Sequence, residues 1–481
     1  MNDSFYLIAP EAHFYELSTL IREYIPLVNV VPTVKEGIPG IVLSADERSG
    51  IRYLENGQEA ASFVLEDSFD GYVGEKSKNE AKVVIARLMG SSLPWGILTG
   101  VRPTKVAFQY LETGLSEEEI AQVLEERYLL RRDKAELCAG VARAERAILA
   151  DHDGLDVSLY VGILFCPTRC SYCSFISNDQ RAYRLYAKDY VEAVLKEMEE
   201  CAPLLRGRRI RSFYMGGGTP TTLDEESLRR ILCKADELFD FSAMDEVTVE
   251  AGRPDTITPG KLRVLKECGV DRISINPQTM NQATLDRIGR AHRTEEIEAA
   301  FQMAREAGFD NINADLIVGL PGEEAEDVAR TMERIRALKP ENVTVHTLAV
   351  KRSSRMNEFG EGAEMLKEET SALAEKIDRM IGIAAKACEE MGLKPYYMYR
   401  QKNMAGNFEN VGYALPGKEG RYNIEIMEER QSIVAFGAGG VTKVYTPEEN
   451  RIERVPNVKG VKEYIERIDE MIERKKEGLK S

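Results

Sequence analysis

The chain has 481 residues, of which 43% are hydrophobic and 30% charged, with a formal net charge of −16. This composition is typical of a soluble globular protein with two or three domains. The acidic balance argues against a general nucleic-acid or acidic-membrane surface, and no uncharged apolar run is long enough to span a membrane.

The N-terminus, "MNDSFYLIAPEAHFYE", lacks the basic and apolar regions of a signal peptide. Eight cysteines in this length are too few for a disulfide framework, so we expect a cytoplasmic protein. Outside one cluster they are scattered singly and are predicted to be small core residues: Cys138, Cys201, Cys233, Cys268 and Cys388.

Residues 1–152 mix short strands with helices and predict an accessory α+β domain. They carry the only tryptophan, within "LPWGILTGVRPTK". The Gly-Val-Arg-Pro-Thr-Lys stretch could cap a helix or hold an anion, although a structural turn is the simpler interpretation.

Residues 157–350 alternate β-branched runs with helical stretches, which predicts βαβ units and a parallel sheet. Six such units favour an α/β fold with a partial (β/α)6 barrel over residues 153–360. Residues 361–481 predict a C-terminal α/β extension that completes the substrate site. It contains a long helix over 364–391, a glycine-rich strand region to about 446 and a charged last helix, expected to be a solvated face.

Polar residues gather where the predicted strands end. The cysteines follow the first strand, "GGGTPT" ends the second, Glu250 the third and Gln278 the fourth, and Asp315 lies within the fifth. Because active sites of such folds form at the carboxyl ends of the strands, this grouping predicts a site there.

The stretch "CPTRCSYCSF" has the spacing C-x3-C-x2-C. Structural zinc needs four ligands, and no second cysteine pair follows at zinc-ribbon spacing, although a distant fourth ligand is conceivable. A redox thiol pair would favour C-x-x-C in a thioredoxin-like pattern, which is absent. Three thiolates suit a [4Fe–4S] cluster with one iron open to a ligand.

With "YMGGGTPT" after it, this motif resembles the radical S-adenosylmethionine (SAM) enzymes of the oxygen-independent coproporphyrinogen III oxidase family. The resemblance covers about residues 157–445, and "LTGVRPTK" and "VEAGRPDTIT" are most similar to the HemZ-type coproporphyrinogen dehydrogenases. It implies that Cys166, Cys170 and Cys173 bind a [4Fe–4S] cluster whose open iron chelates SAM.

The resemblance also implies SAM contacts at a set of positions matching the family pattern. They are Tyr160, Tyr172, Gly217, Gly218, Thr219, Glu250, Gln278, Arg290, Asp315 and Ala349. Alone, each residue has an ordinary structural interpretation, since a triple glycine also makes tight turns.

The family's reaction removes a hydrogen atom from a propionate of coproporphyrinogen III by a 5′-deoxyadenosyl radical, and CO2 is then lost. The implied partners are a tetrapyrrole substrate and a one-electron donor such as flavodoxin or ferredoxin, with no nucleic acid and no membrane. Basic candidates for the propionates are Arg253, Lys351, Arg352 and Arg355, although "KRSSR" could be a solvated charge run.

Two departures from the family pattern leave the substrate open. Phe175 stands where the better-known oxidase has a further cysteine. Tyr422 and Asn423 replace the His-Asn of the haem-binding motif found in a haem-chaperone branch. A haem-binding chaperone, or a radical SAM enzyme acting on another tetrapyrrole, are therefore the alternatives. We expect His346 to line the site or lie in the core, and His292 to lie on the surface.

Overall fold

The computed structural model describes residues 4–25, 28–34, 38–43, 50–55, 58–64, 76–90, 93–175, 177–349, 354–358, 370–401 and 407–480. The chain forms two compact units. The first comprises Met1–Arg146, Leu366–Ala374 and Tyr399–Glu409, and the second the remainder. The expected boundary near residue 152 lies close to Arg146, whereas the predicted extension 361–481 is divided between both units.

The first unit contains a sheet with strand order β2-β1-β3-β4-β5, in which β1 runs parallel to β2 and β3, and the later pairs are antiparallel. Its strands are β1 (Ser4–Ile8), β2 (Asn29–Val31), β3 (Gly40–Leu43), β4 (Gly50–Glu55) and β5 (Gln58–Val64). Its helices are α1 (Glu11–Tyr24), α2 (Lys76–Met89), α3 (Thr104–Glu112), α4 (Glu117–Tyr128) and most of α5 (Arg132–Ile148).

Trp95 is fully buried, and its indole N–H donates to Glu409 Oε2 at 2.8 Å. Lys134 Nζ lies 2.5 Å from Glu409 Oε1, so the buried carboxylate is neutralised. The carbonyl of Val101 accepts from the backbone N–H of Arg400 at 2.8 Å. The tryptophan-containing stretch therefore helps to build the fold of this unit.

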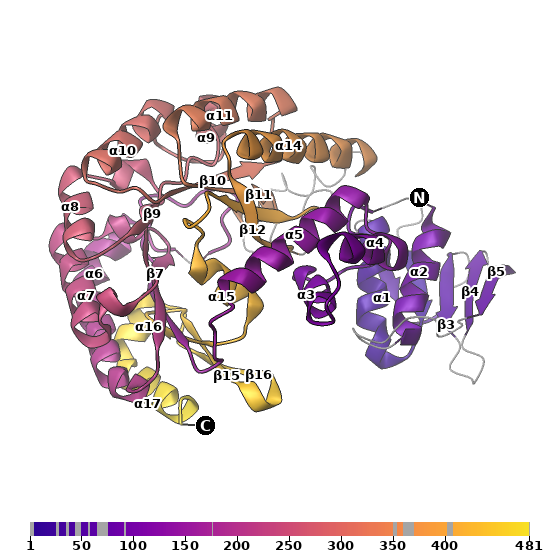
Figure 1. The fold of residues 1–481 in the computed structure, drawn as a ribbon, viewed down its shortest axis with the longest axis horizontal. Helices are drawn as coiled ribbons and strands as arrows, with labels where there is room; N and C mark the ends of the chain where they lie inside the picture. The colour runs from indigo at the N-terminus through magenta and orange to yellow at the C-terminus, as the bar shows by residue number, and fades with distance from the viewer. Residues whose placement is uncertain are drawn as a thin grey trace. The chain divides into compact units, whose positions relative to one another are not determined.

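The second unit contains the predicted barrel (Figure 1). Strands β6 to β11 stand side by side in chain order and run parallel. They are β6 (Val157–Ile163), β7 (Ile210–Gly217), β8 (Glu246–Glu250), β9 (Arg272–Ser274), β10 (Ile312–Val318) and β11 (Asn342–Thr347). These are the strands of the six predicted βα units, so the expected partial (β/α)6 barrel is confirmed.

Helices cover the outside of these strands (Figure 1). They are α6 (Gln180–Cys201), α7 (Glu225–Phe239), α8 (Pro259–Glu267), α9 (Gln282–Arg287), α10 (Thr294–Glu306) and α11 (Ala325–Leu338). Five short 3-10 turns accompany them in the described part of the chain: Ala202–Leu205, Pro220–Thr222, Phe241–Ala243, Pro254–Thr256 and Pro447–Glu449.

The sheet continues beyond both ends of the barrel. β13 (Asn410–Ala414) pairs antiparallel with β11, and β12 (Lys394–Tyr399) lies next to it. At the other end β14 (Ser432–Phe436) runs parallel to β6 and is followed by β15 (Val441–Thr446) and β16 (Arg451–Pro456). The remaining helices are α12 (Arg355–Glu358), α14 (Thr370–Glu390), α15 (Arg421–Glu428), α16 (Val461–Glu466) and α17 (Ile468–Gly478).

The inward-facing side of the barrel strands is polar. Strand side chains alternate between two faces, so Ser158 and Tyr160 share one face of β6, while Leu159, Val161 and Ile163 form the other and are fully buried. On the same inner side the Ser158 and Ser212 hydroxyls lie 2.7 Å apart, and Thr344 Oγ1 donates to Asn313 Oδ1 at 3.0 Å. An eightfold barrel usually fills this space with branched apolar side chains. A polar interior instead suits a polar ligand.

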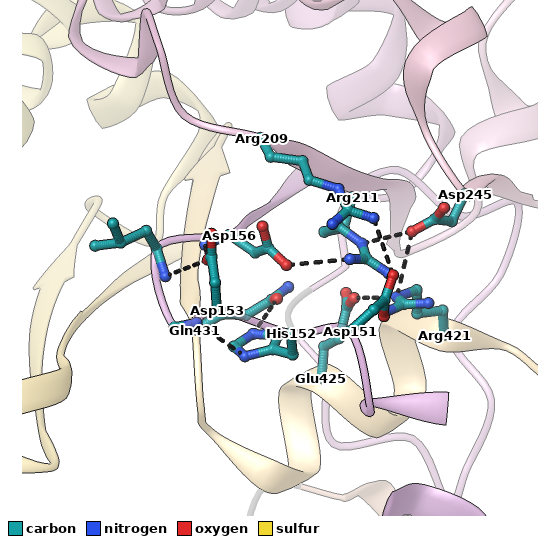
Figure 2. Close-up of polar contacts among 12 residues, drawn as sticks. Asp151, His152, Asp153, Asp156, Arg209, Arg211, Asp245, Arg421, Glu425 and Gln431 are labelled. Carbon is teal, nitrogen blue, oxygen red and sulfur yellow. Dashed lines mark hydrogen bonds and ion pairs between the residues drawn. The ribbon is translucent and has the colours of Figure 1, made fainter. Parts of the chain in front are cut away.

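α15 lies at the amino ends of β6, β7 and β8, where its residues bond to polar groups of these strands (Figure 2). Its Glu425 accepts hydrogen bonds from Ser158 and, at 2.7 Å, from Ser212. Arg421 bonds to Asp151 at 3.1 Å, and its backbone N–H donates to Glu246. We call α15 the base helix.

Arg211, which is 1% exposed, holds this end of the barrel together (Figure 2). Its guanidinium contacts Asp151 at 3.0 Å, Asp156 at 3.2 Å and Asp245 at 2.5 Å. Hydrogen bonds from Arg211 and its neighbours hold the pKa of Asp151 well below its usual range. The network neutralises the buried arginine and fixes the start of β6 and β7.

The expectation that the charged C-terminal helix is a solvated face is wrong for its central lysine. Lys475 on α17 is fully buried and lies 2.5 Å from Glu197 of α6. Glu197 also accepts from the hydroxyl of Tyr464 at 2.6 Å and from the backbone N–H of Gly437 at 2.8 Å. This helix therefore packs through its buried Met471 and Ile472 and pairs one of its charges inside.

The single cysteines are buried as predicted at Cys138, Cys201, Cys268 and Cys388, but Cys233 is exposed. Cys233 Sγ lies 3.5 Å from Cys268 Sγ, so these two are a pair and not isolated core residues. In the described residues, no helix is long and apolar enough to cross a membrane.

Candidate functional site

The three clustered cysteines lie on the loop that follows β6. The backbone N–H of Cys166 donates to Asn178 O at 3.0 Å, and that of Ser171 donates to Ile288 O at 3.0 Å. The loop is thus held between the start of α6 and the segment after α9. Cys170 is buried, whereas Cys166 and Cys173 are partly exposed.

Arg253 fixes this loop from the side. Its guanidinium donates to Thr168 Oγ1 at 2.7 Å and to Thr168 O at 3.2 Å, and it forms an ion pair with Asp255 at 2.7 Å. At 3% exposure its donors face protein groups. The geometry assigns Arg253 to support of the cysteine loop, in contrast to the expected contact with a propionate.

Two of the three thiols, those of Cys166 and Cys173, lie in surroundings that disfavour the free thiolate. Burial raises the pKa of Cys166 and of Cys173, although Thr219 Oγ1, 3.5 Å from Cys166 Sγ, partly opposes this for Cys166. Among the described residues, no three His, Cys, Asp or Glu side chains are grouped as ligands of a single metal ion. An iron–sulfur cluster does not need such convergence, because each thiolate binds a different iron.

The glycines at the end of β7 allow the chain to pass very close to β6 and the segment that follows it. Gly217 has φ +105°, a conformation that side chains rarely adopt, and a Cβ there would lie 3.0 Å from Tyr160 Oη. A Cβ on Gly218 would lie 2.7 Å from Ile163 O and 2.8 Å from Phe165 O. The turn is therefore packed directly against the strand that leads to the cysteines.

Replacing Gly218 with alanine should destabilise the chain by about 1–3 kcal/mol, because β7 must move away from the Ile163 and Phe165 carbonyls. Urea denaturation measures this effect. Gly100→Ala is the control, since a Cβ at Gly100 meets nothing within 4 Å. Equal midpoints for both variants would contradict the close packing of the turn.

Two carboxylates on the inner side of the barrel, Glu250 and Asp315, lie within electrostatic reach of each other. Glu250 ends β8 and accepts a hydrogen bond from Tyr214 Oη at 2.7 Å. Burial, together with the charge of Asp315, raises the pKa of Glu250 to about 7. Although burial alone would raise it, contacts with His346 and Asn313 hold the pKa of Asp315 below its usual value. The distance from His346 Nε2 to Asp315 Oδ1 is 3.8 Å.

Arg290 lies beside the cysteine loop. Its guanidinium donates to Asn276 O at 2.5 Å, and it interacts electrostatically with Tyr172 and Cys170. Its Nε and the Oδ1 of Asn276 are buried without a hydrogen-bond partner. Because such atoms are costly to leave unpaired, they identify places where a bound polar molecule would complete the site.

The other predicted positions fall into three groups. Gln278 follows β9 with φ +67° and bridges to Leu316, while Ala349 is partly exposed just after β11. Arg355 is exposed on α12. Lys351 and Arg352 lie outside the described residues.

His292 corrects a further expectation, because it is 1% exposed and not on the surface. Burial, with the neighbouring Arg290 and Arg253 charges, lowers its pKa to about 4, so the neutral ring is favoured. The sequence interpretation also missed Tyr214. The signal was strand alternation: Tyr214 lies two residues before Gly216, so both lie on the same, inner face of β7.

A partial parallel barrel, a three-cysteine loop after its first strand and a glycine turn after its second define the radical SAM class. The family model of the radical SAM superfamily matches residues 160–335. The oxygen-independent coproporphyrinogen-III oxidase-like protein HemZ of Bacillus subtilis is 36% identical over 427 residues, which cover 87% of this chain and 84% of that protein. The chain belongs to this HemZ-like family of radical SAM proteins.

Two other similar proteins are named for different activities. The haem chaperone HemW of Bacillus subtilis is 30% identical over 315 residues, covering 65% of this chain and 76% of that protein. Coproporphyrinogen III oxidase (HemN) of Escherichia coli, a solved structure, has a TM-score of 0.53 at 22% identity and covers 69% of this chain and 73% of its own. This last likeness concerns the fold.

The superfamily implies a [4Fe–4S] cluster and SAM, and the residues fit both. Three cysteines on one anchored loop supply the thiolates. The buried Nε of Arg290 and Oδ1 of Asn276 have no hydrogen-bond partner and are polar atoms that bound SAM would satisfy.

Proposed function

We propose that this chain catalyses the oxygen-independent oxidative decarboxylation of coproporphyrinogen III to protoporphyrinogen IX. The observation that carries the proposal is the single inner site formed by the cysteine loop, the glycine turn, and the polar residues Glu250, Asp315 and Arg290. When bound, the cluster and SAM supply a carbon radical that removes a hydrogen atom from the substrate. Cluster chemistry of this kind fits a reducing compartment such as the cytoplasm.

In this proposal the chain's own residues bind and orient. Cys166, Cys170 and Cys173 hold the cluster. The carboxylate of Glu250 accepts from the SAM ammonium group, and the guanidinium of Arg290 donates to its carboxylate.

Further SAM contacts are proposed at Tyr160, Tyr172, Gly217, Gly218, Thr219, Gln278, Asp315 and Ala349. Phe175, two residues beyond Cys173, is 65% exposed and offers an apolar face to a tetrapyrrole ring. Arg355 stays a candidate for a propionate.

The base helix speaks against haem binding at the position of the chaperone's motif. Tyr422, which replaces the histidine of that motif, is 4% exposed and stacks on Tyr214 with ring centroids 4.5 Å apart. Asn423 donates to Tyr396 Oη at 3.2 Å. Both side chains are occupied in closing the barrel, so this stretch offers no free ligand to haem iron.

The test is anaerobic reconstitution with iron, sulfide, a reductant and SAM. We expect 5′-deoxyadenosine, and with coproporphyrinogen III a mass loss of two CO2 per substrate. Cys170→Ala should lower 5′-deoxyadenosine formation by at least about a hundredfold, because the cluster loses a ligand. Cys233→Ser, which changes a cysteine outside the loop, should leave it unchanged. SAM cleavage without substrate decarboxylation would favour another tetrapyrrole.

The chaperone alternative is tested by titrating the purified chain with haem. We expect no Soret shift at micromolar haem. A saturable shift with one haem per chain would overturn our assignment of the base helix and favour haem transfer.

A further inference from the structure

Three tyrosines form a stack inside the barrel. Tyr422 of the base helix stacks on Tyr214 of β7 with centroids 4.5 Å apart and an angle of 19°. Tyr160 of β6 lies 6.3 Å from Tyr214 and 6.2 Å from Tyr422, nearly parallel to both. Aromatic contacts of this kind restrict ring orientation. The base helix therefore limits where the Tyr214 ring can lie.

Tyr214 is also the link from the stack to the candidate SAM site. Its hydroxyl donates to Glu250 Oε1 at 2.7 Å. Gly216 lies between them, where a Cβ would be 2.7 Å from Glu250 Oε1 and 2.8 Å from Tyr214 Cε1. The phenol and the carboxylate thus meet directly above Gly216, where any larger residue would collide with both of them.

The base helix is itself firmly anchored (Figure 2). Arg421 and Glu425, on either side of Tyr422 in the sequence, bond to each other at 3.0 Å and to the polar ends of β6 and β7. A rigid support is needed if an aromatic ring is to hold a hydrogen-bond donor in one direction.

We propose that Tyr214, held in place by Tyr422, is a positioning residue that orients the Glu250 carboxylate and stabilises its charge toward a bound ammonium group. This inference rests on the proposed function, which assigns the SAM amino group to Glu250. No direct contact of either tyrosine with SAM is required.

The charged and titratable groups around Glu250 determine how the Tyr214 hydroxyl affects the charge of this carboxylate. Tyr214 and the Gly217 backbone N–H favour the carboxylate form, as does the charge of Arg272, whereas burial and Asp315 oppose it. Tyr160 and Tyr422 also lie within electrostatic reach. Removing the Tyr214 hydroxyl takes away a donor, so the pKa of Glu250 rises and the ionised form needs a higher pH.

The experiment is calorimetric titration of SAM into anaerobically reconstituted protein at pH 6.5, 7.5 and 8.5, with iron content measured in parallel. Tyr214→Phe should weaken SAM binding about tenfold at pH 6.5 and much less at pH 8.5, with unchanged iron content. Tyr422→Ala, which removes the stack but leaves the hydroxyl, should weaken binding at every pH. Tyr445→Phe removes a hydroxyl that donates to exposed Asn450 and should change nothing.

Equal SAM affinity of Tyr214→Phe and the wild-type chain at all three pH values would overturn this inference and leave the proposed function standing. A loss of the same size at each pH would also overturn it, because it would indicate altered packing alone. No SAM binding by the wild-type chain with a full cluster would instead contradict the proposed function.

A separate observation concerns the outer surface of the barrel. Cys233 of α7 is exposed, and its Sγ lies 3.5 Å from that of Cys268, which caps α8. Arg229 lies within electrostatic reach of both thiols. We infer that these two cysteines form a peroxide-sensitive dithiol. Cys233 reacts with hydrogen peroxide to a sulfenic acid and water, and the Cys268 thiol displaces a second water to form the disulfide.

This inference is tested with the full chain and hydrogen peroxide, followed by peptide mass mapping under non-reducing conditions. We expect the peptides with Cys233 and Cys268 to be linked, with a loss of about 2 Da, and to separate on reduction. In Cys268→Ser, Cys233 should instead carry added oxygen. Added oxygen on Cys233 in the wild-type chain, with Cys268 left as a free thiol, would overturn the pairing, as would the absence of any reaction at Cys233.

Discussion

Replacing Glu250 with glutamine is expected to stabilise the cluster-free chain at pH 8 while it weakens SAM binding at least about tenfold. The burial that raises the pKa of Glu250 to about 7 makes its charge costly in the folded state. A neutral amide removes that cost. Because the side chain stays partly exposed, the expected gain is about 1–2 kcal/mol.

The direction in which stability changes with pH follows from the raised pKa of Glu250. The folded-state pKa of Glu250 is raised above its ordinary value of 4.5, so the folded chain loses stability as pH rises from about 4.5 to 7 and stays at the lower level above that. The gain from glutamine should therefore be largest at pH 8 and small at pH 5. Urea denaturation at both values measures it.

Glu298→Gln is the control for this substitution. Glu298 forms a surface ion pair with Arg334 at 2.7 Å, and its removal should change stability by less than about 1 kcal/mol. A gain for Glu250→Gln that is equally large at pH 5 and pH 8 would contradict a buried, charge-dependent role. Unchanged SAM affinity would remove Glu250 from the proposed site.

Replacing Lys475 with methionine should destabilise the chain by about 3–5 kcal/mol, because it leaves Glu197 charged and buried without its cation. Adding Glu197→Gln to Lys475→Met should restore much of the loss, since the uncompensated charge is then removed. The shift of the urea midpoint measures both effects.

Lys476 offers a matched comparison on the same helix. It bonds to Glu200 at 3.0 Å, a pair that water reaches, so Lys476→Met should cost less than about 1 kcal/mol. Equal losses of stability in the two lysine variants would show that the buried pair contributes no more than an exposed one.

The sequence predicted what depends on local pattern. The alternation of strands and helices predicted the barrel. The spacing of Cys166, Cys170 and Cys173 before a glycine turn predicted the candidate site at one end of it. Glu250 was recognisable because it ends a predicted strand, and Asp315 because it is a charged residue within a largely apolar one.

What the sequence did not predict depends on pairing across long separations. Glu197 and Lys475 lie 278 residues apart, and in a charged helix a paired lysine has the same pattern as a solvated one. Tyr422 was recognised as a substitution in a haem motif, but its position inside the barrel depends on how Arg421 and Glu425 bond to residues more than 150 positions earlier in the chain. His292 appeared exposed because polar residues surround it in sequence, whereas in space it lies among Arg253, Asp255 and Arg290.

The base helix has a consequence for the order of events in catalysis. Arg421, Tyr422 and Glu425 occupy the amino end of the barrel, so the proposed function leaves the end that carries the cysteine loop as the way in. A small cofactor that binds deep and a large ring that binds at the rim would then share one entrance. If the proposed function holds, the cofactor would bind before the macrocycle, so kinetics with the two reactants should show compulsory-order binding, with excess macrocycle inhibiting by blocking the entrance.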